Sequence, residues 1–269
     1  MTKVIVAGAA GRMGKRIGYM VNQHQELELA GGFEQTGSPD IGKDIGEIGG
    51  FGALGVSISD SLEAIIDQAD VIIDFTFHEA TMKFARLAAA HKTAMVIGTT
   101  GLSQDNLAEL KKLSANFPCV QAPNMAVGVN VLFKIARKMA NILGDDYDIE
   151  IVEAHHRMKK DAPSGTALKL GEMVAEGVNR NLQEVGVFER NGIIGPRTDK
   201  EIGIQTIRGG DIVGEHTVYF CGAGERLEIT HKASTRDNFA KGAALAAAWI
   251  AGRPNGMYSM FDVLGIDDL

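Results

Sequence analysis

Residues 4–14 read Val4-Ile-Val-Ala-Gly-Ala-Ala-Gly-Arg-Met-Gly14, an apolar run that leads into three glycines at intervals of three. The run predicts a short buried strand, and the apolar residues at helical spacing around and after Gly14 predict a helix. A glycine turn between a strand and a helix lets backbone N–H groups approach a pyrophosphate, and the helix N-terminus adds partial positive charge. The segment therefore predicts a dinucleotide-binding unit. A tight turn without a ligand is the alternative that this segment alone leaves open.

Strand-like and helix-like segments continue to alternate up to residue 121. Strands are expected at Lys3–Ala7, Leu27–Phe33, Val56–Ile58, Ala69–Phe75, Thr93–Ile97 and Pro118–Gln121, and helices at Leu62–Ile66, Glu79–Ala90 and after Ser103. The glycine-rich residues 37–55 are expected to form a long loop. This alternation predicts an α/β fold with a Rossmann-like, doubly wound parallel sheet. Ligands of such sheets bind beyond the carboxyl ends of the strands.

A carboxylate, Glu34, stands at the end of the second expected strand, about 20 residues after Gly14, where it can bind a ribose 2′-OH. A carboxylate favours the free 2′-OH of NADH and repels the 2′-phosphate of NADPH. Position 35 is Gln rather than a cation, although Arg12 could still reach a 2′-phosphate. We therefore predict that NADH is used at least as well as NADPH.

The sequence pattern changes after a long amphipathic helix expected at Val127–Leu143. Apolar and polar residues alternate over residues 147–152, and a helix is expected at Ser164–Val178. Further strands are expected at Thr206–Arg208, Thr217–Cys221 and Leu227–His231, and a capping box at residues 234–237 before the Ala-rich helix Phe239–Ile250. The pattern predicts a second α+β domain built on a mixed or antiparallel sheet.

The most informative segment reads Glu153-Ala-His-His-Arg-Met-Lys-Lys-Asp-Ala-Pro-Ser-Gly-Thr-Ala167. Ser164 is the expected N-cap of a helix, so the amides of Gly165 and Thr166 form an anion site. Histidine is a natural proton donor near neutral pH. The segment predicts a pocket for an anionic, carboxylate-bearing substrate with acids able to protonate it. Taken singly, each histidine is more often structural, and the spacing matches no metal-ligand motif, so no metal is predicted.

Composition and charge exclude several classes of protein. The 269 residues are 45% hydrophobic and 23% charged, which is typical of soluble globular chains. The net charge of −7 argues against a nucleic-acid partner, and the longest apolar run, Ala243–Ala251, is too short to cross a membrane. The apolar start is short and basic residues follow it, so a signal peptide is not expected. Two cysteines, Cys119 and Cys221, fit a cytoplasmic protein without a disulfide framework.

Over nearly its whole length the chain resembles the bacterial dihydrodipicolinate reductases. Besides residues 4–14 and 153–167, the resemblance is carried by Gly98-Thr-Thr-Gly101, Asn124-Met-Ala-Val-Gly-Val-Asn130, Arg208-Gly-Gly-Asp-Ile-Val-Gly-Glu-His216 and His231-Lys-Ala-Ser-Thr-Arg236. It implies an NAD(P)H-dependent oxidoreductase that reduces 4-hydroxy-tetrahydrodipicolinate, a cyclic imine dicarboxylate, to tetrahydrodipicolinate in the diaminopimelate route to lysine. It also implies a homotetramer. The implied domains are residues 1–126 with 239–269, which bind the dinucleotide, and residues 127–238, which bind substrate and form the oligomer.

The resemblance implies a role for individual residues as well. His155 is expected to be the proton donor or acceptor and Lys159 the proton donor, while His156, Gly165 and Thr166 would bind the substrate carboxylates. The cofactor would contact three sets of residues, for the pyrophosphate, the adenosine ribose and the nicotinamide: Gly8, Ala9, Ala10, Gly11, Arg12 and Met13; Glu34; and Gly98, Thr99, Thr100, Ala122, Pro123, Asn124 and Met125. Several family members carry an Arg after the ribose-binding Glu, where this chain has Gln35.

Two functions from other classes remain open at this point. A non-catalytic regulatory protein that senses NAD(H) would explain the glycine turn and Glu34, but it would not explain the anion site at Gly165 and Thr166. A semialdehyde dehydrogenase that works through a thioester would need an exposed, activated thiol. Cys119 and Cys221 both stand in apolar surroundings and are poor candidates for one.

Overall fold

The computed structural model describes residues 1–269 and divides the chain into two compact units. The first contains Met1–Val127 and Arg236–Gly265, and the second contains Gly128–Thr235 and Ile266–Leu269. The main difference from the expected domains is that the last four residues group with the second unit. No helix of the chain is long and apolar enough to cross a membrane.

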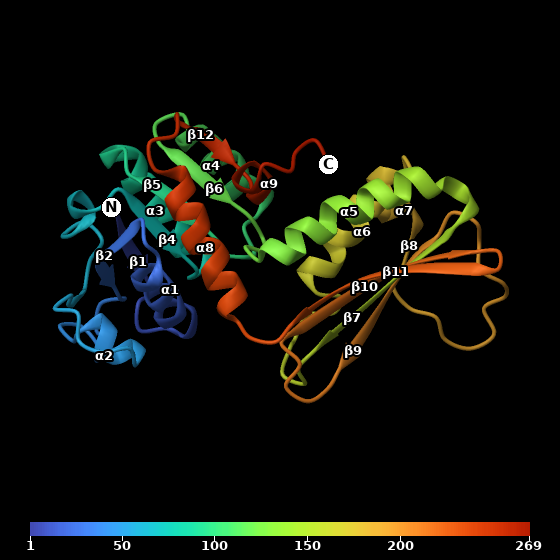
Figure 1. The fold of residues 1–269 in the computed structure, drawn as a ribbon, viewed down its shortest axis with the longest axis horizontal. Coiled ribbons are helices and arrows are strands. Elements are labelled where there is room, and N and C mark those ends of the chain that lie inside the picture. Colours follow the sequence, from blue (N-terminus) through green and yellow to red (C-terminus); the bar gives the residue numbers. More distant parts are fainter. The chain divides into compact units, whose positions relative to one another are not determined.

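The first unit is a seven-stranded sheet in the order β12-β6-β5-β4-β1-β2-β3, with every neighbouring pair parallel (Figure 1). The chain runs outward from β1 to β3 and then returns to β4, which lies beside β1 on the other side. This reversal is the switch point at which ligands bind in doubly wound sheets, and the predicted Rossmann-like fold is confirmed. The strands are β1 (Thr2–Ala7), β2 (Leu27–Phe33), β3 (Ile58–Ser59), β4 (Val71–Asp74), β5 (Ala94–Ile97), β6 (Pro118–Gln121) and β12 (Gly256–Tyr258).

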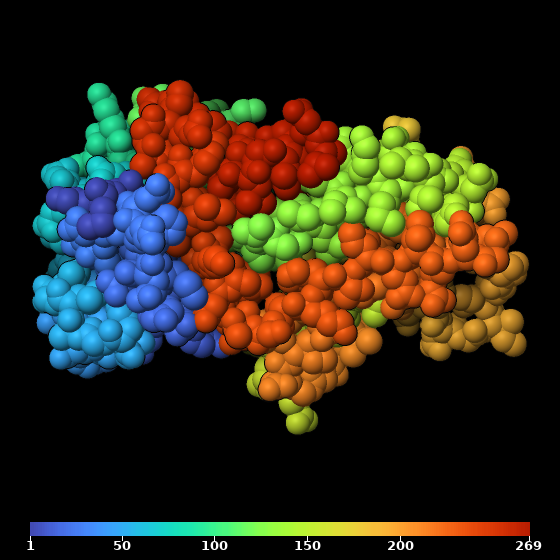
Figure 2. All heavy atoms as spheres, viewed as in Figure 1, coloured from blue at the N-terminus to red at the C-terminus, as the bar shows by residue number.

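Helices cover both faces of this sheet because its central strands are apolar on both sides. Val4 and Val6 pack with α1 and α8, whereas Ile5 and Ala7 pack with α3 and α4 on the opposite face. Figure 2 shows the atoms of α8 against those of α1. The helical segments are α1 (Arg12–Gln23), α2 (Ile45–Gly49), η1 (Ile66–Gln68), α3 (His78–His91), α4 (Gln104–Leu113), α8 (Asp237–Ile250) and α9 (Met260–Leu264).

The second unit is a five-stranded mixed sheet in the order β11-β10-β7-β9-β8. β7, β8 and β9 run parallel, while β10 is antiparallel to both β7 and β11. The helices α5 and α6 lie on one side of the sheet (Figure 1), so the predicted α+β domain is confirmed. Its elements are α5 (Val127–Leu143), η2 (Gly144–Asp146), β7 (Asp148–His155), α6 (Gly165–Gly177), α7 (Leu182–Val185), β8 (Gly186–Val187), β9 (Ile202–Arg208), β10 (Gly214–Gly222) and β11 (Glu225–Ala233).

Three local predictions are wrong, and each has a physical reason. The loop expected at residues 37–55 contains the helix α2, whose first amides, those of Gly46 and Glu47, are capped by the Asp44 carboxylate. Leu62 and Ile66 are both buried, but a turn followed by the short 3-10 helix η1 places them in the core instead of an α-helix. The capping box at residues 234–237 is absent, because α8 begins at Asp237 and its N-cap, Arg236, makes no side-chain cap. The Asp237 carboxylate instead binds the Arg16 guanidinium of α1 at 2.6 and 2.7 Å.

Candidate active site

The glycine turn before α1 is shaped by two glycines. Gly8 has a φ of +63°, a left-handed conformation that favours glycine, and its carbonyl accepts the Gly11 amide at 2.9 Å. A Cβ on Gly14 would lie 2.0 Å from the Gly8 carbonyl oxygen, so the helix can start this close to the turn only with glycine there. No side chain caps α1, and its first turn holds no acidic residue. This helix N-terminus can therefore serve an anionic ligand.

A cavity of about 840 Å³ opens beside this turn. Gly8, Gly11, Arg12, Met13 and Glu34 of the expected cofactor site line it; Ala9 and Ala10 lie in the same turn but outside the lining. Glu34 accepts the Ala10 amide at 2.9 Å, which ties the end of β2 to the turn. The volume and the uncapped helix fit a dinucleotide.

Three further residues of this cavity were not expected from the sequence. Lys83 and the aromatic rings of Phe77 and Phe84 come from α3 and its N-cap, and all three line the cavity. Phe77 is 76% exposed, which is unusual for a large apolar side chain. Lys83 adds a second cation to Arg12, and three carboxylates, those of Glu34, Asp60 and Glu63, line the same cavity.

The loops expected at the nicotinamide follow two neighbouring strands of the same sheet. Gly98, Thr99 and Thr100 come directly after β5, and residues 122–125 come directly after β6. Because β5 and β6 run parallel to β4 and β1, both loops leave the sheet at the edge that carries the glycine turn. Neither loop lines the 840 Å³ cavity, so the structure does not bring them together with the turn in one pocket.

A buried carboxylate, Asp74, organises this edge of the sheet. It has no exposed surface and accepts hydrogen bonds from the hydroxyls of Thr76, Thr81 and Thr99. Burial raises the pKa of Asp74 in spite of these hydrogen bonds. Asp74 therefore connects the end of β4 to α3 and to the Thr99 loop, which makes it a structural support of the expected nicotinamide side.

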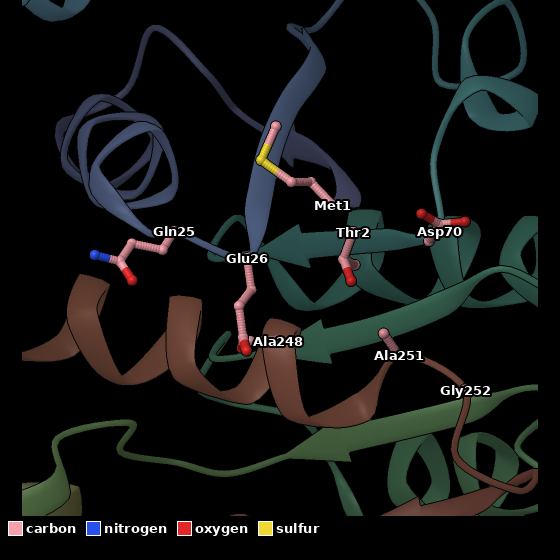
Figure 3. A pocket seen from close by; sticks show the side chains of 8 residues that line it. All are labelled: Met1, Thr2, Gln25, Glu26, Asp70, Ala248, Ala251 and Gly252. Carbon is pink, nitrogen blue, oxygen red and sulfur yellow. The ribbon is translucent and has the colours of Figure 1, made fainter.

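A second hollow, of about 650 Å³, lies away from the turn at the amino end of β1 (Figure 3). No basic side chain lines it, and one of its carboxylates, Asp70, already accepts the Lys3 amide at 2.8 Å. This hollow therefore offers no site for a phosphate or a carboxylate.

In the second unit, the end of β7 carries a buried ion pair. The Glu153 carboxylate has no exposed surface and lies 2.6 Å from His155 Nδ1 and 2.9 Å from the Ser164 amide. The Arg208 guanidinium donates to both of its oxygens at 2.8 Å. Burial alone would raise the pKa of Glu153, but the hydrogen bonds from His155, Arg208 and Ser164 outweigh it and hold that pKa well below its usual range. An ionised carboxylate only accepts hydrogen bonds, so His155 Nδ1 is the donor.

A second histidine, His216 of β10, lies against His155. The two rings meet edge to face with centroids 5.3 Å apart, and His216 Nε2 lies 3.1 Å from the Ser164 hydroxyl. Burial lowers the pKa of His216 to about 3, so this ring is neutral at neutral pH. Its Nδ1 is buried without a partner. Of these two histidines, only His155 is therefore paired with a carboxylate.

The remaining expected substrate residues follow β7 in the chain. Lys159 Nζ lies 2.8 and 2.9 Å from the two Asp161 oxygens, and the Asp161 carbonyl accepts Arg208 at 2.6 Å. His156 is half-buried just beyond the strand. Gly165 and Thr166 form the first turn of α6, whose N-cap, Ser164, accepts the Ala167 amide. Arg208 thus connects the Lys159–Asp161 pair to Glu153. Glu153 in turn contacts His155 and the N-terminus of α6.

Neither cysteine has the features of an exposed nucleophile. Cys119 is fully buried, and burial raises the pKa of its thiol. Cys221 is half-buried, and both thiols are free. The chain also contains no group of three or more His, Cys, Asp or Glu side chains placed to hold a metal ion.

Two family models cover almost the whole chain. The N-terminal model of dihydrodipicolinate reductase matches residues 2–125, and the C-terminal model of the same enzyme matches residues 128–264. The chain belongs to the dihydrodipicolinate reductase family. The resemblance seen in the sequence is thereby confirmed. Membership makes the chain an NAD(P)H-dependent oxidoreductase of the lysine and diaminopimelate route, and nothing in these comparisons favours the non-catalytic regulator.

Individual relatives agree with this family. The chain is 71% identical to a 4-hydroxy-tetrahydrodipicolinate reductase of Desulfotalea psychrophila, with all of both chains covered. It is 52% identical to the enzyme of the same name from Syntrophobacter fumaroxidans, over 99% of this chain and 100% of the relative. A dipicolinate-bound dihydrodipicolinate reductase from Paenisporosarcina sp. TG-14 shares the fold with a TM-score of 0.75 and 25% identity, over 97% of this chain and 98% of that one.

Sequence reasoning missed Asp74, Lys83, Asp161 and Arg208 as parts of the site, and it gave Glu153 no role. Glu153 and Asp161 stand inside the segment that was singled out, and Arg208 begins another of the quoted motifs. A carboxylate two positions before a histidine was therefore an available signal for the Glu153–His155 pair. Lys83 had no such signal, because only the fold brings α3 to the cavity.

Proposed function

We propose that this protein transfers hydride from NAD(P)H to 4-hydroxy-tetrahydrodipicolinate and yields tetrahydrodipicolinate. The observation that carries the proposal is the buried contact of His155 with Glu153. Arg208 connects Glu153 to the loop that holds Lys159 and Asp161. The Ser164 amide connects Glu153 to the N-terminus of α6. It joins proton donors to an anion site within one short segment, which suits an anionic substrate that gains a proton.

The first unit supplies the cofactor site in this proposal. Residues 8–13 would hold the pyrophosphate at the uncapped end of α1, with Arg12 and Lys83 as counter-charges. Glu34 would bind the adenosine ribose, and residues 98–100 and 122–125 would line the nicotinamide. When bound, the reduced nicotinamide supplies the hydride.

The second unit supplies substrate binding and protonation. His156 and the first-turn amides of Gly165 and Thr166 would bind the substrate carboxylates. Loss of the 4-hydroxyl group as water gives a conjugated C=C–C=N system. Hydride addition to this system leaves an enamine anion, and a proton delivered to carbon from His155 or Lys159 converts the anion to the imine product. Supplying that proton from a positioned side chain contributes roughly 10²–10⁴-fold in rate.

Cofactor preference follows from the end of β2. Glu34 carries a negative charge beside Gln35, so we propose that NADH is used at least as well as NADPH. Arg12 and Lys83, which line the same cavity, keep NADPH acceptable. In a Glu34→Gln variant the kcat/KM ratio should shift toward NADPH, since the repulsion of a 2′-phosphate is removed. An unchanged ratio would exclude Glu34 as the determinant.

We further propose a homotetramer in the cytoplasm. One face of the five-stranded sheet packs on α6 through residues such as Ile204, while Ile207 of the opposite face is 51% exposed. The Gln205 amide nitrogen on that face is buried without a partner. An exposed apolar side chain on a sheet face favours association with further copies. The two free cysteines fit a reducing compartment.

The decisive assay follows NADH and NADPH oxidation in parallel, with substrate formed in place from pyruvate and aspartate semialdehyde by the preceding synthase. Substrate-dependent oxidation is expected with both cofactors. Dipicolinate, a planar dicarboxylate of the same size, should compete with the substrate and leave the KM for NADH unchanged. No oxidation alongside an active synthase would refute the proposed reaction.

A further inference from the structure

A carboxylate outside the expected set of site residues joins the two halves of the substrate site. Glu153 meets His155 Nδ1 at 2.6 Å on one side and the Ser164 amide at 2.9 Å on the other. Thr206 Oγ1 adds a longer contact of 3.3 Å. With the two bonds from Arg208, every side of this carboxylate has a protein donor, although it has no exposed surface.

We propose that Glu153 is the positioning residue of the reduction: it holds His155 in the form with hydrogen on Nδ1 and anchors the first turn of α6. The opposite nitrogen, Nε2, then carries the proton that is transferred. The N–H bond at Nε2 breaks as a C–H bond forms on the enamine anion left by hydride addition, and the imidazole is left neutral with its hydrogen still on Nδ1. This inference rests on the proposed function.

Charge explains why the arrangement holds its form. A buried carboxylate without a counter-charge would take up a proton and become a donor, but the Arg208 guanidinium binds both oxygens and keeps it ionised. The ionised Glu153 carboxylate can only accept a hydrogen bond. A neutral His155 therefore keeps its hydrogen on Nδ1, because in the other tautomer the lone pair of Nδ1 would point at the negative carboxylate. A positioned carboxylate of this kind also stabilises the imidazolium form.

The surroundings of His155 leave Nε2 for the substrate. A Cβ on Gly214 of β10 would lie 3.0 Å from Nε2, so glycine at this position keeps a side chain away from that nitrogen. His216 lies against the ring but is neutral at neutral pH. The other charged or titratable groups around the pair are Arg208 of β9, His231 of β11, and Lys159 and Asp161 of the loop after β7.

The test replaces Glu153 with Gln, which keeps the shape and removes the charge. In ¹⁵N-histidine NMR spectra of the free protein, His155 of the wild type should carry its hydrogen on Nδ1, and Glu153→Gln should shift it toward the Nε2–H tautomer. The variant's kcat should fall on the order of 10²-fold, with the KM for NADH unchanged. The alkaline limb of its kcat/KM profile should move to lower pH, because the imidazolium loses a stabilising negative charge.

Glu150→Gln is the matched control. Glu150 stands on the same strand and also pairs with arginine, in its case Arg190 and Arg197, but it does not contact His155. This variant should show neither the tautomer shift nor the change in pH profile. If Glu153→Gln does not fold, Glu153→Asp retains the charge beside Arg208, and it should keep the wild-type pH profile while lowering kcat.

The outcomes separate this inference from the proposed function. A folded Glu153→Gln protein with the wild-type tautomer and pH profile would overturn the positioning role, even with an active wild type. A kcat loss without either change would assign Glu153 a purely structural role and overturn it too. An inactive wild type would refute the proposed reaction, while the tautomer of the free protein would still decide whether Glu153 controls His155.

Discussion

His155 and His216 lie ring against ring, yet their neighbours give them different chemistry. His155 donates to an ionised carboxylate, whereas His216 contacts only the neutral Ser164 hydroxyl and the other ring. Burial lowers the pKa of His216 to about 3, and no carboxylate accepts a hydrogen bond from its ring. Residue type alone could not have told these two histidines apart.

His216 should make the stability of the protein depend on pH. An unfolded histidine takes up a proton near pH 6.5, whereas buried His216 stays neutral down to about pH 3. The unfolded state binds more protons in this window, so the free energy of unfolding falls as the pH drops. Between pH 6.5 and 4.5 we expect a slope of up to about 1.4 kcal/mol per pH unit from this residue. Burial lowers the pKa of His231 as well, which adds in the same direction.

Urea unfolding at several pH values measures that slope. His216→Gln should flatten it, leaving the smaller contributions of His231 and of carboxylates such as Glu153. A variant with the wild-type slope would show that His216 titrates normally in the folded protein.

The two adjacent lysines offer a second test at single residues. Lys159 is held by Asp161 next to the substrate segment, whereas Lys160 is exposed. Lys159→Ala should lower kcat by about 10²-fold, with the KM for NADH within about twofold, because only proton donation is lost. Lys160→Ala should leave both constants near wild type. Steady-state kinetics of the two variants decide the point, and equal turnover in both would remove Lys159 from the mechanism.

Among the elements, the long apolar segments were predictable and several of the shortest were not. The bounds expected for β2 and α5 are the observed ones, because a seven-residue apolar run that ends at Glu34 and a 17-residue amphipathic stretch leave few alternatives. The strand β12 was missed, since Gly256–Tyr258 becomes a strand only by pairing with β6. The capping box at residues 234–237 failed for a similar reason: the long-range partner Arg16 competes for Asp237.

The start of α1 should be more sensitive to a methyl group than its middle. Gly14→Ala would place a Cβ 2.0 Å from the Gly8 carbonyl oxygen, so the helix must move away from the turn. We expect weaker NADH binding by more than about tenfold and a loss of several kcal/mol in stability. In Gly18→Ala, on the same helix, the new Cβ would lie 3.6 Å from its nearest neighbours, side-chain atoms of Ile45 and Phe51. This variant should change the free energy of unfolding by less than about 1 kcal/mol.

Isothermal titration calorimetry with NADH and thermal unfolding of both variants test this contrast. If Gly14→Ala binds NADH as tightly as Gly18→Ala, the close approach of α1 to the turn is not needed for the cofactor.

For the whole molecule, the sequence revealed the segments of the site but not their connection. Residues 4–14 and 153–167 were recognisable because each concentrates its chemistry in one stretch. Arg208 binds Glu153 across 55 positions of sequence, and this contact depends on β9 pairing with β7. Strand order in a mixed sheet follows from packing of the complete unit, so such a partner could not be assigned from a local pattern.

The face of the second sheet that carries Ile207 should hold copies of the chain together. Ile207→Lys would place a charge on this face, and the assembly should dissociate to smaller species in sedimentation velocity runs. Ile142→Lys is the control, because Ile142 is 71% exposed on α5, on the other side of that sheet. If Ile207→Lys sediments like the wild type, this face is not the interface of the proposed tetramer.

The return of the chain to its first unit has a consequence for synthesis on the ribosome. The strands β1, β4 and β5 are made early, but α8, which covers Val4, Val71 and Val96, comes from residues 237–250. The part of this face that α8 covers therefore stays open to water until nearly the whole polypeptide has been translated. During that interval the growing chain exposes the apolar surface that chaperones bind and that promotes aggregation, so the rate of elongation through the second unit sets how long this risk lasts.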